Sequence, residues 1–303
     1  INYLEKIKLI DQKENPFCFL SDTFDLLKFY ETKKLKLCFG HSVPYKKFFL
    51  DKSLLTKYNY LFLPGYYHFN RIKKYHSLNE TKNLKVLGTI KLSPLMKKNF
   101  DKKNFNKKIN LKHNFNVLFA PSHDAHAEPS KVKFFPELYG DQIEKLEKLI
   151  TFLDKLKANL IIKLHHYHTS QLSNEIFKKY KNVYIFQSGN FFDVQESSNF
   201  IYNSDVIITD TSGVGSSGIF LDKKMIFIEP SSKKWNWKNA DIEKHLRPGY
   251  VCYNFSDLKK SLTNYINKKD IFKKRRNKFV KKIFYKPHKD ATIEIAKFIQ
   301  SIS

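Results

Sequence analysis

The segment Asp205-Val-Ile-Ile-Thr-Asp-Thr-Ser-Gly-Val-Gly-Ser-Ser-Gly-Ile-Phe-Leu-Asp-Lys-Lys-Met-Ile-Phe-Ile-Glu-Pro230 contains two short apolar runs separated by a serine- and glycine-rich turn. Val206–Ile208 and Met225–Ile228 are too short for helices, and we expect each to be a strand buried on both faces of a parallel sheet. The small residues between the runs predict a turn followed by a short helix that ends near Leu221. The segment therefore predicts a strand–turn–helix–strand unit of an α/β fold.

The turn in this segment has the composition of a phosphate-binding site. It follows a predicted strand, at the edge where open α/β sheets hold their ligands. Ser212, Gly213 and Gly215 bring backbone N–H groups and a hydroxyl to a helix N-terminus, which suits a phosphate or pyrophosphate. An ordinary turn in which Asp210 or Ser212 only caps the helix fits the same spacing. The turn has no P-loop pattern, and its Gly-x-Gly-x-x-Gly match comes too late in the chain for the usual dinucleotide fingerprint.

The composition of the chain favours anionic partners. Its 303 residues predict two domains, and 55 Lys and Arg against 29 Asp and Glu give a net charge of +26. Such a charge suits nucleotide phosphates, phosphate-bearing polymers, anionic membrane surfaces or nucleic acid. Three widely spaced cysteines form neither a zinc pattern nor a disulfide framework, so we expect a reducing compartment. No uncharged apolar run of about 18 residues predicts a membrane span. The first residue is Ile1, which favours a piece cut from a longer protein.

Strands and helices alternate in two parts of the chain, on either side of the basic, aperiodic stretch 97–114. We therefore predict two parallel-sheet α/β domains, residues 1–105 and residues 115–285. A helix at 286–303 follows, and we expect it to pack back on the first domain.

Two groups of histidines follow predicted strands of the second domain. His123 and His126 form one group, and His165, His166 and His168 form the other. Adjacent histidines at a strand end point in opposite directions, and no carboxylate pair accompanies them, so we expect no metal site. The absence of a Gly-x-Ser-x-Gly elbow argues against a serine hydrolase.

A series of motifs gives a more specific indication. In chain order they are Phe39-Gly-His-Ser-Val-Pro-Tyr-Lys46, Val117-Leu-Phe-Ala-Pro-Ser122, Ile161-Ile-Lys-Leu-His165, Asp205-Val-Ile-Ile-Thr-Asp-Thr-Ser212, Lys224-Met-Ile-Phe-Ile228 and Arg247-Pro-Gly249. This order resembles the CDP-glycerol glycerophosphotransferases, which include teichoic-acid-type polymerases and primases and relatives in capsule synthesis. The resemblance covers residues 35–300 and is best in 115–230.

The resemblance implies a GT-B-like fold of two Rossmann-type domains facing across a cleft, with the acceptor on the first domain and the donor on the second. It implies transfer of glycerol phosphate, or a related alditol phosphate, from a CDP-linked donor to a hydroxyl of a cell-surface polysaccharide or teichoic-acid-like acceptor. CMP is released, and neither a cofactor nor a metal is required. The implied catalytic residues are His41, as the base, and His165. The implied donor-binding residues are Ser122, His123, Lys163, Asp210, Thr211, Ser212, Gly213 and Arg247.

The chain departs from the family pattern at several of these motifs. Gly40 and Ser42 flank His41 where Trp and Gly are usual, and Thr211 and Gly213 replace a Tyr and a Ser. Both prolines around His165 are also replaced. These changes leave the identities of the alditol and the acceptor open. A GT-B sugar transferase that uses a nucleotide sugar for capsule or lipooligosaccharide synthesis is the alternative, followed by a non-catalytic protein that binds an anionic polymer or nucleic acid.

The tail 267–289 is densely basic, with interleaved apolar residues that predict one or two amphipathic helices. A solvated helix face and attachment to an anionic membrane both fit this pattern, and nucleic acid fits less well. We expect a cytoplasmic protein, peripheral on the inner face of the cell membrane, that binds no nucleic acid.

Overall fold

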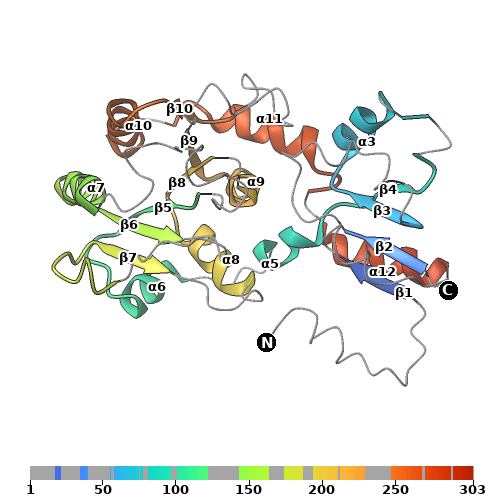
Figure 1. Ribbon diagram of the computed structural model, residues 1–303, viewed down its shortest axis with the longest axis horizontal. Coiled ribbons are helices and arrows are strands. Elements are labelled where there is room, and N and C mark those ends of the chain that lie inside the picture. Colours follow the sequence, from blue (N-terminus) through green and yellow to red (C-terminus); the bar gives the residue numbers. More distant parts are fainter. Residues whose placement is uncertain are drawn as a thin grey trace. The chain divides into compact units, whose positions relative to one another are not determined.

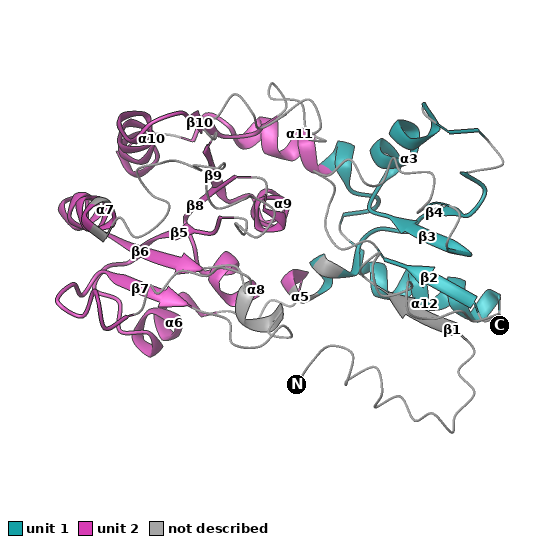
Figure 2. Ribbon diagram, in the orientation of Figure 1, with its two compact units in different colours: residues 1–93, 281–303 teal, residues 94–280 magenta. Residues whose placement is uncertain are grey.

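The computed structural model describes residues 18–21, 35–39, 55, 58–74, 76–77, 81–96, 101–121, 143–163, 174–186, 194–210, 212–228, 247–267, 270–287 and 289–302 (Figure 1). The chain divides into two compact units (Figure 2). Unit 1 contains residues 1–93 and 281–303, and unit 2 contains residues 94–280.

Unit 1 is built on a four-stranded parallel sheet whose strands lie in chain order. The strands are β1 (Cys18–Ser21), β2 (Leu35–Cys38), β3 (Tyr60–Leu63) and β4 (Leu84–Val86). The helical elements of the unit are α3 (Tyr66–Lys73), the 3-10 helix η3 (Ile90–Leu92) and α12 (Ala291–Ser301).

The two faces of this sheet are covered by α3 and α12, which lie far apart in the sequence. Successive side chains of a strand point to opposite faces, so Leu61 and Leu63 pack with Ile72 of α3, whereas Phe62 packs with Ile295 of α12. The ring of Phe62 also meets the ring of Phe298 edge-on, with 5.7 Å between centroids. The last residues of the chain therefore belong to the core of unit 1.

Unit 2 contains a six-stranded parallel sheet in the order β10-β9-β8-β5-β6-β7. The strands are β5 (Phe115–Phe119), β6 (Ala158–Lys163), β7 (Val183–Phe186), β8 (Val206–Thr209), β9 (Lys224–Ile228) and β10 (Tyr250–Cys252). The helices are α6 (Lys102–Lys108), α7 (Ile143–Lys155), α8 (Val194–Tyr202), α9 (Gly213–Phe220) and α10 (Phe255–Asn267). Two further helices, α5 (Ser93–Met96) and α11 (Lys273–Ile283), contain the sequence boundaries between the units.

Helices cover both faces of the second sheet. Val117 and Val206 belong to a core cluster with Leu153 of α7 and Leu258 of α10. On the other face, α9 packs against Ile207 of β8. All four residues of β8 are buried, which explains why Val206–Ile208 form a continuous apolar run rather than an alternating one. The predicted α/β class with parallel sheets is confirmed.

Two segments differ from their sequence-based descriptions. Residues 102–108, which fall within the stretch expected to be aperiodic, form α6 in unit 2. Asp101 caps this helix, and Asn106 accepts a hydrogen bond of 2.7 Å from the Asn116 amide. Arg276 in the basic tail has only 1% of its surface exposed, because its guanidinium pairs with Asp222 and Asp270. No helix among the described residues is long and apolar enough to cross a membrane.

Candidate functional site

The candidate site lies where the strand order of the second sheet reverses. From β5 the chain continues to β6 and β7 on one side, and then to β8, β9 and β10 on the other. Open α/β sheets bind ligands at the carboxyl ends of the two strands that flank such a switch point, which here are β5 and β8. The Thr209 hydroxyl donates to the Ala120 carbonyl at 2.8 Å, and the Ala120 N–H donates to the Ile208 carbonyl at 2.9 Å. These two bonds hold the strand ends together.

The turn after β8 is shaped by its own polar side chains. The Asp210 carboxylate is buried and accepts a hydrogen bond of 3.0 Å from the Ser212 N–H. Ser212 is the N-cap of α9, and its hydroxyl accepts from the Val214 N–H at 3.4 Å. The Ser216 hydroxyl donates to the Gly213 carbonyl at 2.8 Å. Asp210 therefore fixes the shape of the turn, and Ser212 presents the N-terminus of an eight-residue helix at the strand end.

Two glycines let α9 approach the sheet closely. A Cβ atom at Gly215 would lie 3.2 Å from Thr209 Cγ2, and one at Gly218 would lie 2.6 Å from Ile207 Cδ1. Contacts this short need a neighbour to shift, so any larger residue would push the helix away from β8. The second and third glycines of the Gly-x-Gly-x-x-Gly match thus serve helix–strand packing.

Lys163 supplies a cation at the same edge of the sheet. It is the last residue of β6, the strand next to β5, and its side chain is half-buried. Burial lowers the pKa of its ammonium group. No carboxylate among the described residues pairs with it. A desolvated and uncompensated ammonium group is well placed to gain from an anionic ligand.

Arg247 supplies a second cation. Its side chain is buried, and its guanidinium carbon lies 5.7 Å from the centroid of the Phe227 ring. The same ring lies 4.0 Å from the position of a Cβ on Gly215, in the first turn of α9. Phe227 thus connects Arg247 to the turn. The sequence does not mark Phe227 as a site residue, although its place near the end of a buried strand is a signal for it.

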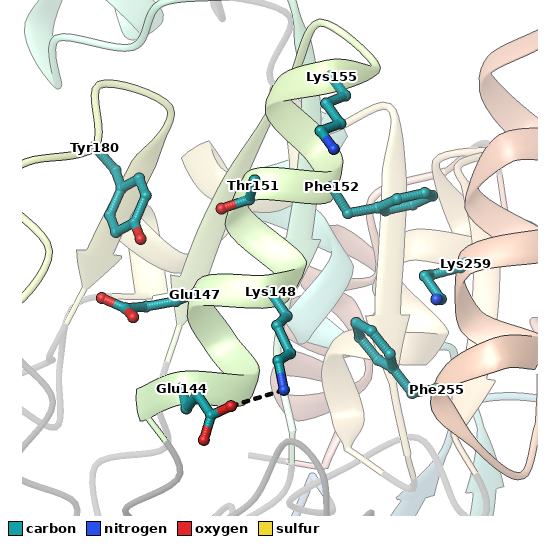
Figure 3. Close-up of a pocket in the computed structure, with 9 residues that line it drawn as sticks. All are labelled: Glu144, Glu147, Lys148, Thr151, Phe152, Lys155, Tyr180, Phe255 and Lys259. Carbon is teal, nitrogen blue, oxygen red and sulfur yellow. Dashed lines mark ion pairs between the residues drawn. The ribbon is translucent and has the colours of Figure 1, made fainter.

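A shallow groove of about 480 Å³ lies elsewhere in unit 2, between α7 and α10 (Figure 3). Its lining includes Phe152 and Phe255, with Lys259 over the Phe255 ring at 5.2 Å, and none of the predicted site residues. Among the described residues, no group of three or more His, Cys, Asp or Glu side chains could hold a metal ion.

The sequence matches the model of a protein family described as CDP-glycerol:poly(glycerophosphate) glycerophosphotransferase over residues 41–301. The chain belongs to this family. The predicted family and the predicted transferase class are thereby confirmed. A comparison with curated proteins gave no match.

Solved structures share the fold of this glycerophosphotransferase family member. The wall teichoic acid polymerase TagF has a TM-score of 0.71 at 14% identity, over 94% of this chain and 72% of the TagF chain. The S. aureus MnaA–UDP co-structure has a TM-score of 0.61 at 14% identity, over 99% of this chain and 78% of that chain. The Methanocaldococcus jannaschii UDP-GlcNAc 2-epimerase, solved with UDP-GlcNAc and UDP, has a TM-score of 0.58 at 16% identity, over 98% of this chain and 78% of that chain. These likenesses confirm the predicted GT-B type of fold.

The described structure contains only part of the predicted site of this glycerophosphotransferase relative. All of the following lie in unit 2 and are described: Lys163 at the end of β6, Asp210, Ser212 and Gly213 directly after β8, and Arg247, which precedes β10 and lies over the Phe227 ring. The other predicted site residues, His41, Ser122, His123, His165 and Thr211, lie outside the described residues. The catalytic and donor-binding roles of all ten stay predictions.

Proposed function

We propose that the chain transfers glycerol phosphate from CDP-glycerol to a hydroxyl of a poly(glycerol phosphate)-type polymer of the cell wall or capsule, and releases CMP. The family match over residues 41–301 carries this proposal, because it includes almost the whole chain. A related alditol phosphate in place of glycerol phosphate fits the same chemistry.

The donor diphosphate would bind at the turn after β8. The N–H groups of Ser212, Val214 and Gly215 are already bonded within the turn. The Gly213 N–H has no partner in the described structure, and together with the helix dipole it would attract an anion. Lys163 adds a positive charge at the end of β6, and Arg247 adds another through its contact with Phe227. Asp210 is already bonded to the Ser212 N–H, so its part would be to hold the turn rather than to contact phosphate.

The chemical step would be an in-line attack of the acceptor hydroxyl on the β-phosphorus of CDP-glycerol. His41 would take the hydroxyl proton as the attacking oxygen forms its bond to phosphorus. The bond between the β-phosphorus and the bridging oxygen would break, and CMP would leave with the electron pair. His165 and the Ser212 turn would stabilise the charge that develops on the phosphoryl oxygens. We propose that this reaction needs no cofactor and no metal ion.

We place this reaction in the cytoplasm, at the inner face of the cell membrane. Exposed side chains on α11 and just before it support this location. Ile271 is 69% exposed, and Lys274, Lys278 and Lys281 are exposed on the helix that follows. An exposed aliphatic side chain beside several lysines suits the surface of an anionic bilayer.

A panel of CDP-glycerol, CDP-ribitol, UDP-sugars and CMP-sugars tests the proposal through the shift in melting temperature and the nucleotide released. A donor at about 100 times its Kd should add about 2.7 kcal/mol to the free energy of unfolding, which raises Tm by several degrees. We expect this shift with a CDP-alditol, and CMP on addition of acceptor. A response limited to a nucleotide sugar would favour the sugar transferase. Binding of polymer or nucleic acid with no nucleotide turnover would favour a binding protein.

A further inference from the structure

Unit 1 carries a cluster of tyrosines and lysines near the carboxyl end of β3, built from the first residues of α3 and from the end of α11 and the residues after it. We call Tyr66, Tyr67, Lys282, Tyr285 and Lys286 the tyrosine–lysine cluster. The rings of Tyr66 and Tyr285 meet edge-on with 5.6 Å between centroids. Lys282 Nζ lies 5.1 Å from the centroid of the Tyr67 ring, and Lys286 Nζ lies 4.8 Å from that of Tyr285. Two stretches that are about 200 residues apart in the sequence therefore build one surface.

The backbone holds these two stretches together. The Tyr285 N–H donates to the Pro64 carbonyl at 2.7 Å. A Cβ atom at Gly65 would lie 2.1 Å from the Ile283 carbonyl oxygen, so only glycine allows this approach. The cluster is thus positioned by main-chain contacts rather than by flexible side chains alone, which lowers the entropy lost when a ligand binds.

The charge of the cluster is positive. Lys282 is exposed, and no carboxylate among the described residues pairs with it. Lys286 has one acidic neighbour, Glu294, at 3.7 Å. Cation–π contacts fix both ammonium groups over rings without neutralising them. Tyr66 is 56% exposed, so its ring is available to a ligand as well.

A buried polar group adjoins the cluster. His68 is 5% exposed, its ring meets that of Tyr67 edge-on at 5.5 Å, and neither ring nitrogen has a hydrogen-bond partner in the described structure. Burial lowers the pKa of His68 to about 3, although the Gly65 backbone opposes this shift. The ring is therefore neutral and offers one donor and one acceptor. Both ring nitrogens are buried, so His68 packs beneath the Tyr67 ring and is not itself exposed to a ligand.

We propose that the tyrosine–lysine cluster binds the phosphodiester chain of the polyol phosphate acceptor. Lysine ammonium groups bind phosphate as point charges. Tyrosine rings offer faces for C–H groups of a polyol and hydroxyls for its oxygens. This inference rests on the proposed function, because it names where the acceptor of that reaction is held.

The composition of the cluster favours a polar polymer over a membrane. Exposed aliphatic side chains would be needed to enter a bilayer, and Ile176, Ile271 and Ile293, which are the large ones among the described residues, lie outside the cluster. The rings of the cluster pack against one another and against cations instead of presenting an apolar face.

The test is the binding of a defined synthetic glycerol phosphate oligomer to the full chain without donor, measured by calorimetry. Lys282→Glu and Tyr66→Ala alter exposed side chains, so both variants should fold. Lys281→Glu is the matched control, because Lys281 is exposed on the same helix and makes no ring contact in the described structure. We expect Lys282→Glu to raise the oligomer Kd about tenfold, Tyr66→Ala to raise it several-fold, and Lys281→Glu to change it much less.

If Lys282→Glu and Lys281→Glu weaken oligomer binding equally, the attraction between charges is general and the proposal is overturned. Unchanged oligomer binding by both cluster variants would also overturn it. Loss of binding to anionic vesicles with unchanged oligomer binding would assign the cluster to the membrane instead. CMP release from CDP-glycerol is measured separately. Cluster-dependent oligomer binding by a chain that releases no CMP would overturn the proposed function and leave the cluster as a polymer site.

Discussion

Replacement of Ser212 by alanine should weaken both the start of α9 and the binding of the donor. The hydroxyl accepts from the Val214 N–H, and its loss as an N-cap costs about 1 kcal/mol of stability. For a unit the size of unit 2, this lowers Tm by about 2–4 °C. The hydroxyl proton has no acceptor in the described structure, so it is available to a donor phosphate. Loss of a hydrogen bond to a charged group costs about 1.5–3 kcal/mol, which raises the Kd for CDP-glycerol by about tenfold to about 150-fold.

A second N-cap separates the two effects. Asp101 caps α6 by accepting from the Lys103 N–H at 2.9 Å, and it is not among the predicted site residues. Asp101→Ala should lower Tm by a similar amount and leave the Kd for CDP-glycerol at the wild-type value. Calorimetric titration with CDP-glycerol and thermal unfolding of both variants give the comparison. If Ser212→Ala loses only the stability that Asp101→Ala loses, and keeps the wild-type Kd, Ser212 is a cap and not a donor ligand.

Three further predictions concern the same unit. Lys163→Met should weaken donor binding about tenfold without lowering Tm, because it removes a desolvated charge and keeps the volume; calorimetry showing an unchanged Kd would contradict this. Gly218→Ala should cost about 1–3 kcal/mol, because its Cβ would meet Ile207 Cδ1 at 2.6 Å; urea unfolding with wild-type stability would contradict it. Burial alone would raise the pKa of Asp270, but the Arg276 guanidinium outweighs this and lowers it. The ionised pair thus stabilises the fold above about pH 3.9, and this stabilisation is lost as the pH falls through the lower folded pKa. Asp270→Asn should therefore cost about 3–5 kcal/mol at pH 7 and less at pH 3; an equal cost in urea unfolding at both pH values would count against the pairing.

The β8–α9–β9 unit could be predicted from the sequence because its signals are local. Three consecutive buried apolar residues, a capping serine and closely spaced glycines specify a strand, a turn and a helix within 25 residues. The same local signals also predicted parallel strands that are buried on both faces. Ser212 proved to be the cap that the plainer interpretation of the turn expected, which does not exclude a second role for its hydroxyl.

The positions of the charged groups at the site depend on residues far apart in the chain. The position of Arg247 over Phe227 and the partial burial of Lys163 follow from how the strands pair, which the sequence does not state. The basic tail shows the same limit of sequence-based prediction. Its composition predicted a solvated or membrane-facing helix, yet Arg276 is buried because it pairs with Asp222, which lies far away in the sequence, as well as with the nearby Asp270. The tyrosine–lysine cluster also depends on the return of the C-terminal segment to unit 1.

The most direct test of the account is the fate of the donor in a reaction with CDP-glycerol, labelled in its glycerol, and a glycerol phosphate-primed acceptor. Nucleotide products are separated by chromatography, and label in the polymer is counted. Attack at the β-phosphorus predicts one CMP released for each glycerol phosphate incorporated, and no CDP. We expect this ratio from the wild-type chain, and loss of both products from His41→Ala while CDP-glycerol still binds. Release of CDP, or incorporation of glycerol without its phosphate, would contradict the proposed transfer.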